Sequence, residues 1–245
     1  MSKTIQPEII FADEHLLLVN KPANMLSLPD RYNASLPNMR DWLQALYGKI
    51  YVVHRLDRET SGIMCFARTT EAHLHLSRQF NQRSVEKNYL VLVDGQFAEP
   101  EGVIDLPIGE NMAKRGTMRI DMQEGKPSLT LWRVEESFAQ FTLVQCNIKT
   151  GRMHQIRVHM LAIGHPPAVD PIYGKRDAFY LSQIKRKYKV GKFQETEQPL
   201  MQRVTLHAFN LLLQHPQTLE EMNFDAPLPK DFAALLRQLR LHNAQ

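Results

Sequence analysis

The order of apolar and polar residues along the chain predicts short strands interrupted by a few amphipathic helices. Two apolar runs near the N-terminus, 9–11 and 16–19, flank a polar stretch and predict a hairpin. Further apolar runs at regular spacing predict strands over 63–67, 89–93, 103–106, 118–122, 128–134, 141–148, 204–213 and 222–224. Apolar residues at helical spacing predict helices over 38–46, 69–83, 153–163 and 231–241. Together these elements predict an α+β fold with a mixed, mostly antiparallel central sheet and flanking helices.

Composition places the chain among ordinary folded proteins. It has 245 residues, of which 43% are hydrophobic and 23% charged, and it shows no internal repeat and no linker-like tract. We therefore expect a single domain over 1–245. No apolar run approaches the roughly 18 residues that span a bilayer, and the N-terminus lacks a signal-peptide pattern. With only Cys65 and Cys146 and no CxxC spacing, a cytoplasmic protein without a membrane partner is expected.

The positive charge of the chain is concentrated in one segment. The formal net charge is +4, and residues 175–203 alone hold eight Lys or Arg against three acidic residues. We treat about 176–203 as a basic insertion in which Lys185, Arg186 and Lys187 form the densest cluster. Two interpretations stay open: the cluster binds RNA phosphates, or it is a solvated, mobile insertion.

A dense polar stretch lies directly before the strand predicted over 63–67. It reads His54-Arg55-Leu56-Asp57-Arg58-Glu59-Thr60-Ser61-Gly62. Its residues alone allow two interpretations, a solvated loop with a surface Arg–Asp pair, or a loop that presents Asp57 as a catalytic carboxylate. Thr60, Ser61 and Gly62 are interpreted as the turn that positions this loop.

This stretch, with its following strand, resembles the signature of the RluA-type pseudouridine synthase family. Further blocks agree with that family in order and spacing, namely Val19-Asn20-Lys21-Pro22, Lys87-Asn88-Tyr89, residues 150–160 and Leu206-His207-Ala208. The resemblance covers about residues 8–232 and is greatest to the single-domain branch, which lacks an S4-type RNA-binding domain.

The resemblance implies the pseudouridine synthase fold and the isomerisation of uridine to pseudouridine in a stem-loop of rRNA or tRNA, without a cofactor or metal. By the same resemblance Asp57 is the catalytic carboxylate, acting either as a nucleophile at C1′ or as the base that gives a glycal. Arg157 holds that carboxylate charged, and Tyr89 stacks beneath the target uracil. Arg55 contacts the flipped nucleotide or fills its place, with a surface ion pair to Glu59 as the alternative.

The remaining expectations concern substrate contacts, metals and partners. His54 and Thr60 are grouped with the residues that contact substrate, together with the cluster of Lys185, Arg186 and Lys187. The pairs His73/His75 and His154/His159 lie two or five residues apart, which does not place them on one helical face, so no metal site is expected. RNA is the expected partner, and the protein is expected to be a monomer.

Two positions depart from the family pattern. Asn24 stands where a glycine is usual, and asparagine tolerates a positive φ better than most residues. Val169 also stands at a glycine position, and a β-branched residue does not adopt that conformation easily, so the loop before Asp170 is expected to follow its own path.

Two competing functions stand beside this interpretation. A non-catalytic RNA-binding or chaperone protein on the same fold is the main alternative. A glycoside hydrolase would need a second carboxylate paired with Asp57, and the sequence offers only Glu59 nearby.

Overall fold

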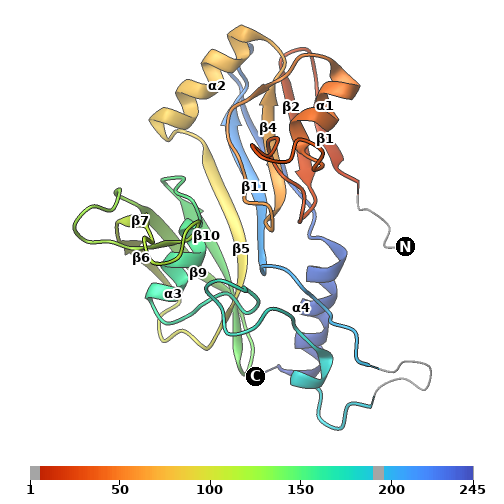
Figure 1. Cartoon of the computed structure of the whole chain (residues 1–245), viewed down its shortest axis with the longest axis vertical. Helices are drawn as coiled ribbons and strands as arrows, with labels where there is room; N and C mark the ends of the chain where they lie inside the picture. The colour runs from red at the N-terminus through yellow and green to blue at the C-terminus, as the bar shows by residue number, and fades with distance from the viewer. Residues whose placement is uncertain (1–5, 190–195, 245) are drawn as a thin grey trace. The chain divides into compact units, whose positions relative to one another are not determined.

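The computed structural model describes residues 6–189 and 196–244. Within these ranges no helix is both long and apolar enough to cross a membrane. The elements in chain order are β1 (Glu8–Ala12), β2 (Leu16–Lys21), α1 (Met39–Tyr47), β3 (Tyr51–Val52), β4 (Ser61–Ala67), α2 (Thr70–Gln82), β5 (Glu86–Asp94), β6 (Glu101–Asp105), β7 (Ile108–Glu110), β8 (Met118–Ile120), β9 (Leu129–Ser137), β10 (Phe141–Ile148), α3 (Gln155–Ala162), η1 (Leu181–Gln183), β11 (Leu206–Gln214), β12 (Glu221–Asp225) and α4 (Lys230–His242). The predicted α+β class, with a mixed and mostly antiparallel sheet, is confirmed (Figure 1).

The chain divides into two compact units. Unit 1 comprises residues 1–89 and 207–227, and unit 2 comprises residues 90–206 and 228–245. The strands β5 and β11 each contribute residues to both units. The expectation of a single domain over 1–245 stays a prediction.

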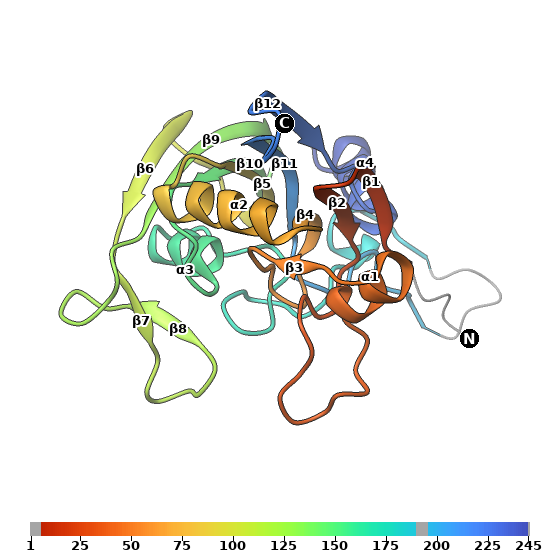
Figure 2. The same ribbon diagram turned by 90° about the horizontal axis from the view of Figure 1, so that it is seen from above.

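Unit 1 is built on strands in the order β1-β2-β4-β11, with β3 paired to β4 and β12 paired to β11 (Figure 2). The predicted N-terminal hairpin is confirmed, since β1 and β2 are antiparallel. The side chain of Asp13 closes its turn by accepting hydrogen bonds from the backbone N–H groups of His15 and Leu16, each at 2.7 Å. A short acidic side chain at a turn therefore sets where β2 begins.

The core of unit 1 lies along β2 and β4. All seven residues of β4 are buried, and Leu16–Val19 of β2 are fully buried. A strand that is covered on both faces has apolar residues at consecutive positions rather than at alternate ones, which explains the apolar run at 63–67. The helix α2 packs against β4, and its buried Gln79 pairs through its amide with both backbone groups of Gln214.

Both helices of unit 1 begin at residues whose side chains cap them. The side chain of Asn38 accepts a hydrogen bond from the backbone N–H of Asp41, and Thr69 caps α2 in the same way through Ala72. Gly48 ends α1 with a φ of 73°, a conformation that glycine adopts at little cost. Residues adjacent to the helices in the sequence therefore determine where α1 and α2 begin and where α1 ends.

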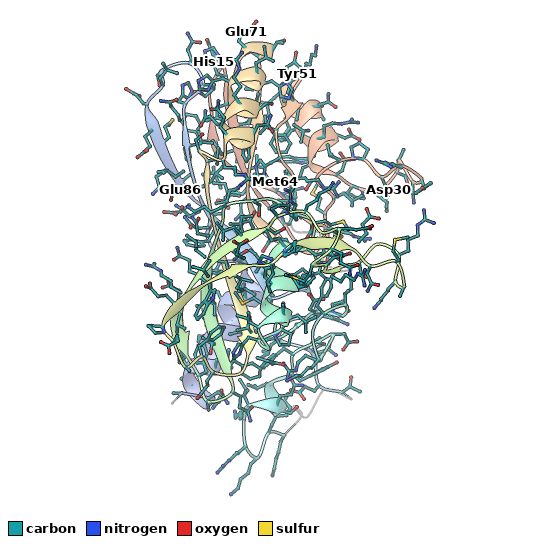
Figure 3. The ribbon with its side chains drawn as sticks, turned by 90° about the vertical axis from the view of Figure 1, so that its left-hand side faces the viewer. His15, Asp30, Tyr51, Met64, Glu71 and Glu86 are labelled. Atoms are coloured by element: carbon teal, nitrogen blue, oxygen red, sulfur yellow. The ribbon has the colours of Figure 1, made fainter. Side chains whose placement is uncertain are left out.

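The strand β3, which precedes the loop before β4, contacts the start of α2 through the side chain of Tyr51. The Tyr51 hydroxyl lies 2.9 Å from Oγ1 of Thr70, and the Tyr51 and His73 rings stack at 5.2 Å between centroids. Figure 3 labels Tyr51 and Glu71 at this end of unit 1. Because β3 has only two residues, no periodicity in the sequence could reveal it.

Unit 2 contains strands in the order β5-β10-β9-β6 and a separate two-stranded sheet of β7 and β8. Its main core packs α4 against apolar side chains of β5, β10 and the connecting segments, and includes Leu92, Phe138, Phe141, Leu143, Val169, Phe179, Ile184, Met201, Phe232, Leu235, Leu236 and Leu239. The β8 strand ends at Ile120 rather than at 122, because the side chain of Asp121 accepts hydrogen bonds from the backbone of Gln123 and Glu124 and turns the chain.

The helix α3 is shorter and more buried than its sequence predicts. Its apolar residues predict a single buried stripe, whereas every residue from Gln155 to Met160 is buried. His154 precedes the helix with a φ of 56°, so the helix begins at Gln155 and not at 153. Arg157 is therefore buried inside unit 2 and is not an exposed residue of the helix.

Candidate active site

Asp57 lies in a loop between β3 and β4 that is fixed through the residue before it. Leu56 is buried, and its backbone is held on both sides by the hydroxyl of Ser27. The Leu56 N–H donates to Ser27 Oγ at 3.1 Å, and Ser27 Oγ donates to the Leu56 carbonyl at 2.7 Å. Ser27 also lies 3.5 Å from the sulfur of Met64, a β4 residue that Figure 3 labels. One small polar side chain therefore anchors the loop to the core, and Asp57 itself is half-buried.

A buried lysine holds the same loop from the other side. The ammonium of Lys21, at the end of β2, is fully buried and donates to the carbonyls of Pro22, Met25 and Arg58 at 3.0, 2.8 and 3.1 Å. The Arg58 carbonyl also accepts from the N–H of Asn24 at 2.8 Å. A charge buried this deeply must be hydrogen-bonded, and here one of its three acceptors is the carbonyl directly after Asp57.

The expectation for Asn24 is confirmed, since its φ is 64°. This left-handed conformation directs its N–H toward the Asp57 loop. Glycine is the usual residue for such a backbone, and asparagine is among the few others that accept it.

His54 contributes to the same loop as a neutral ring. Its Nε2 accepts a hydrogen bond from the backbone N–H of Cys65 at 2.9 Å, and its ring stacks on Phe80 of α2 at 4.7 Å. Burial, together with the nearby positive charge of Lys87, lowers the pKa of His54 to about 3. The ring therefore stays uncharged at neutral pH and ties the loop to β4 and α2.

The start of β4 admits very little change. Ser61 and Gly62 pair in parallel with His207 and Ala208 of β11, and Ser61 Oγ lies 2.9 Å from His207 Nδ1. Gly62 has a φ of 121°, and a Cβ at this position would overlap the Ala208 carbonyl oxygen. Thr60 is buried directly before this pair. The turn itself lies at Arg58 and Glu59, where the Thr60 N–H donates to the Asp57 carbonyl at 3.2 Å. Ser61 and Gly62 are therefore the first residues of β4 and not part of the turn that the sequence predicts over 60–62.

Tyr89, in β5, is buried in the same unit as Asp57. Burial raises the pKa of its phenol above the usual value of 10, and the negative charge of Asp57 raises it further. The structure therefore brings Asp57 within electrostatic reach of a phenol that stays protonated at neutral pH.

Arg157 is held by a carboxylate whose role the sequence does not reveal. Its Nε and Nη2 donate to the two oxygens of Asp170 at 2.6 and 2.9 Å, and both side chains are buried. Asp170 also accepts from the backbone N–H groups of Ile172 and Tyr173, and the Arg157 guanidinium lies over the Tyr173 ring at 4.9 Å. Asp57 belongs to unit 1 and Arg157 to unit 2, so their expected pairing stays a prediction.

The loop before Asp170 carries the second departure from the family pattern. Val169 does not adopt a positive φ. It is buried and exchanges hydrogen bonds with Thr205, whose N–H donates to the Val169 carbonyl at 3.1 Å. Packing and hydrogen bonds to Thr205 therefore fix this loop, which places Asp170 within hydrogen-bond distance of Arg157.

The other expected contact residues lie on the surface. Arg55 is exposed and, in the described part of the chain, forms no ion pair with Glu59. Lys185, Arg186 and Lys187 are exposed in unit 2, in the turn after η1, while Lys192 of the same basic run lies outside the described residues. Across 6–189 and 196–244, no group of three or more His, Cys, Asp or Glu side chains is arranged to hold a metal ion.

Comparison with known proteins gives a consistent result. A sequence pattern described as RNA pseudouridylate synthase matches residues 15–162. The chain is 38% identical over 247 residues to the ribosomal large subunit pseudouridine synthase D of Nitrosomonas europaea, covering 98% of this chain and 67% of that protein. It is also 38% identical over 216 residues to the dual-specificity RNA pseudouridine synthase RluA of Vibrio vulnificus, covering 86% of this chain and 79% of that one.

Solved structures agree with these sequence relatives. The human protein RNA Pseudouridylate Synthase Domain Containing 1 superposes with a TM-score of 0.69 at 28% identity, covering 98% of this chain and 97% of that chain. The human protein RNA Pseudouridylate Synthase Domain Containing 4 gives a TM-score of 0.70 at 25% identity, covering 95% and 93%. The similarity thus extends over nearly the whole fold.

Proposed function

Because the chain belongs to the RNA pseudouridylate synthase family, whose members are isomerases that convert uridine to pseudouridine in RNA, we propose that it carries out this reaction with Asp57 as its catalytic carboxylate. The observation that carries the proposal is the way the Asp57 loop is fixed. Ser27 holds the backbone before Asp57, and Lys21 holds the backbone after it. A group that must meet a reacting carbon needs such support from neighbouring residues.

The reaction exchanges one bond for another and leaves the composition of the RNA unchanged. The bond between N1 of uracil and C1′ of ribose breaks, the base turns, and C5 bonds to C1′. The hydrogen on C5 then leaves as a proton, while N1 gains one. Asp57 acts either by attacking C1′ or by removing the 2′ hydrogen to give a glycal, and both routes need its ionised form.

Tyr89 is proposed to lie beneath the target uracil. Its raised pKa favours a neutral phenol, which offers an aromatic face for stacking and one O–H donor. A phenolate is disfavoured beside the negative charge of Asp57. We therefore assign Tyr89 to stacking and hydrogen bonding, with any help in removing the C5 proton limited by that high pKa.

Arg157 is proposed to supply positive charge to the catalytic carboxylate. Its planar guanidinium is fixed by Asp170 on one edge and by the Tyr173 ring on one face, which orients the remaining N–H donors. His54 and Thr60 support the loop, and Arg55, which is exposed, is proposed to contact the flipped nucleotide. Removing a base from its stack costs a few kcal/mol, so a side chain that occupies the vacated space favours the flipped state.

The substrate is proposed to be a stem-loop of ribosomal or transfer RNA. One relative is named for the large ribosomal subunit and another for dual specificity. A cytoplasmic, monomeric enzyme fits this substrate. Mapping pseudouridines in total RNA from cells with and without the gene would identify the modified position.

The function is tested by the change Asp57→Asn, which removes the charge and almost no volume. With uridine tritiated at C5 in ribosomal and transfer RNA, the wild-type protein should release tritium, and the variant should release none above background. RNA affinity should change less than about threefold, since a neutral amide does not weaken phosphate contacts.

The matched control is Glu71→Gln, which makes the same charge change at the exposed start of α2 (Figure 3). It should keep the wild-type rate. Tritium release by Asp57→Asn at a rate near that of the wild type would show that another residue carries the chemistry. A wild-type protein that binds RNA but releases no tritium would favour the non-catalytic alternative.

A further inference from the structure

Unit 2 contains a pocket of about 640 Å³ whose walls come from three separate stretches of the chain. They are the turn at 139–140, residues 182–186 after the start of η1, and residues 241–244 at the end of α4. In Figure 1 the segment that carries η1 lies beside the end of α4. The pocket contains none of the residues assigned above to the uridine reaction, apart from the basic cluster.

The charge of the pocket is positive. Lys185, Arg186 and His242 line it, and among the described residues no Asp or Glu does. Lys185 and Arg186 are exposed, and within the described ranges neither forms an ion pair or a side-chain hydrogen bond. The acid that contacts a lining residue is Glu197, which accepts a hydrogen bond from the backbone N–H of Ser182 at 2.8 Å and does not itself line the pocket. Two cations without acidic partners favour an anion in this pocket.

The basic wall is held in place by an ordered stem. Phe179 and Met201 form a backbone bridge, in which the Phe179 N–H donates to the Met201 carbonyl at 2.8 Å. Ile184, one residue before Lys185, is buried in the core around α4. The Ser182 N–H donates to Glu197 at 2.8 Å, which ties the two sides of the stem together. The backbone that carries Lys185 and Arg186 is therefore attached to the core of unit 2, while both side chains are exposed.

The opposite wall is equally fixed. Asn243 is buried, and its backbone and side-chain oxygens accept hydrogen bonds from the N–H groups of Ala139 and Gln140 at 2.8 and 3.2 Å. The end of α4 and the 139–140 turn therefore keep their spacing. A pocket with fixed walls binds a ligand without an added entropic cost of ordering them.

We propose that this pocket binds a phosphodiester group of the RNA, at a contact separate from the target uridine. No Phe, Tyr or Trp of the described chain lines it, so it lacks the stacking surface that a base requires. Ser182 and Gln140 add neutral donors, which commonly accompany Lys and Arg at phosphates. Lys187 and Lys189 extend the positive charge beyond the pocket. The identity of the anion as RNA rests on the proposed function.

The test compares two double variants that remove the same charge from unit 2. Lys185→Gln with Arg186→Gln empties the pocket of its cations. Lys230→Gln with Arg237→Gln removes two exposed cations of α4 that do not line the pocket. Binding to a mixture of ribosomal and transfer RNA is measured by filter retention over a range of salt concentrations, with thermal unfolding as the check on folding.

The pocket variant should bind RNA about tenfold more weakly at low salt. The slope of log Kd against log salt should fall by about one for each phosphate that the variant no longer neutralises. The α4 variant should keep the wild-type slope. A charge-preserving exchange, Lys185→Arg with Arg186→Lys, should restore most of the affinity and thereby separate charge from folding.

Equal affinity of the wild-type and pocket variants, or an equal loss in the α4 variant, would overturn the proposal. A pocket variant with unchanged RNA affinity but weaker binding to phosphatidylglycerol vesicles would overturn it in favour of a lipid headgroup. Because retention does not depend on turnover, this result is separate from tritium release. A wild-type protein that makes no pseudouridine would refute the proposed function. The comparison of RNA affinities among the variants would still test whether the pocket binds RNA.

Discussion

A single buried ammonium connects two loops of unit 1. Lys21 donates to three carbonyls, two in the chain that follows β2 and one directly after Asp57. Backbone carbonyls left without partners in a buried place each cost roughly 1–3 kcal/mol, so the lysine stabilises a geometry that the backbone alone would not keep. Lys21 thus acts as a positioning residue for Asp57.

His54 makes the stability of the same loop depend on pH. Its folded-state pKa of about 3 lies below the ordinary value of 6.5. A histidine whose pKa is depressed by folding stabilises the folded protein above its unfolded pKa, and that contribution is lost as the pH falls from about 6.5 toward 3. The free energy of unfolding should therefore decrease on acidification by at most about 1.4 kcal/mol per pH unit from this residue.

Urea unfolding of the wild type and His54→Gln at pH 7.5 and pH 5 measures the effect. Glutamine keeps an acceptor for the Cys65 N–H but does not titrate. The variant should lose less stability between the two pH values than the wild type. Equal losses in both proteins would show that folded His54 takes up its proton as readily as the unfolded chain does, so that folding does not lower its pKa.

At the scale of elements, the parallel pairing of β4 with β11 depends on one glycine. Gly62 combines a positive φ with a neighbouring carbonyl that a Cβ would overlap, and Gly48 has a positive φ with nothing within 4 Å. Gly62→Ala should therefore lower the free energy of unfolding by more than about 3 kcal/mol. Gly48→Ala should lower the free energy of unfolding by only about 1–2 kcal/mol, which is the cost of a left-handed backbone for a residue with a Cβ.

Denaturation in urea, followed by circular dichroism, compares the two alanine variants directly. A loss for Gly62→Ala that merely equals the loss for Gly48→Ala would mean that β11 shifts to accommodate the methyl group. In that case the pairing of Ser61 with His207 is not a fixed feature of the site.

The elements that sequence could predict are those with a local cause. The hairpin of β1 and β2 follows from the turn at Asp13, and α1 and α2 follow from the caps at Asn38 and Thr69. The sequence does not predict β3, β7 and η1, which have two or three residues, whereas it predicts the equally short β8 because Met118, Ile120 and Met122 alternate with polar residues. The full burial of α3 depends on partners from distant parts of unit 2, so its pattern alone indicated an exposed face.

The residues of the candidate site also divide into those that the sequence could predict and those that it could not. The motif around Asp57 identified the loop, and the structure adds Lys21 and Ser27, whose roles arise from contacts across 29 or more residues. Asp170 lies 13 residues after Arg157, in a loop rather than on the same helix, so no helical spacing linked the two. The roles of Tyr89 and Arg157 came from family resemblance alone.

At the scale of the whole molecule, β5 and β11 each continue from one unit into the other. A strand cannot lose its pairing in one half without fraying the other, so we expect both units to unfold in one cooperative transition. Each unit contains one of the two tryptophans, Trp42 in unit 1 and Trp132 in unit 2. This allows the units to be followed separately.

The variants Trp42→Phe and Trp132→Phe each leave one fluorescent reporter. Urea midpoints measured with the two variants should coincide after correction for any change in stability that circular dichroism records. Calorimetric and van 't Hoff enthalpies of the wild type should also agree. Two separated midpoints would identify two domains and contradict the expectation of one.

The backbone bridge between Phe179 and Met201 closes the basic stretch at its base, where the chain leaves and rejoins the core around α4. Loops closed in this manner tolerate changes of length at little thermodynamic cost. Evolution can therefore lengthen, shorten or recharge this stretch while α4 and the Asp57 loop keep their structures. Selection for a new RNA would then proceed without disturbing the isomerisation itself.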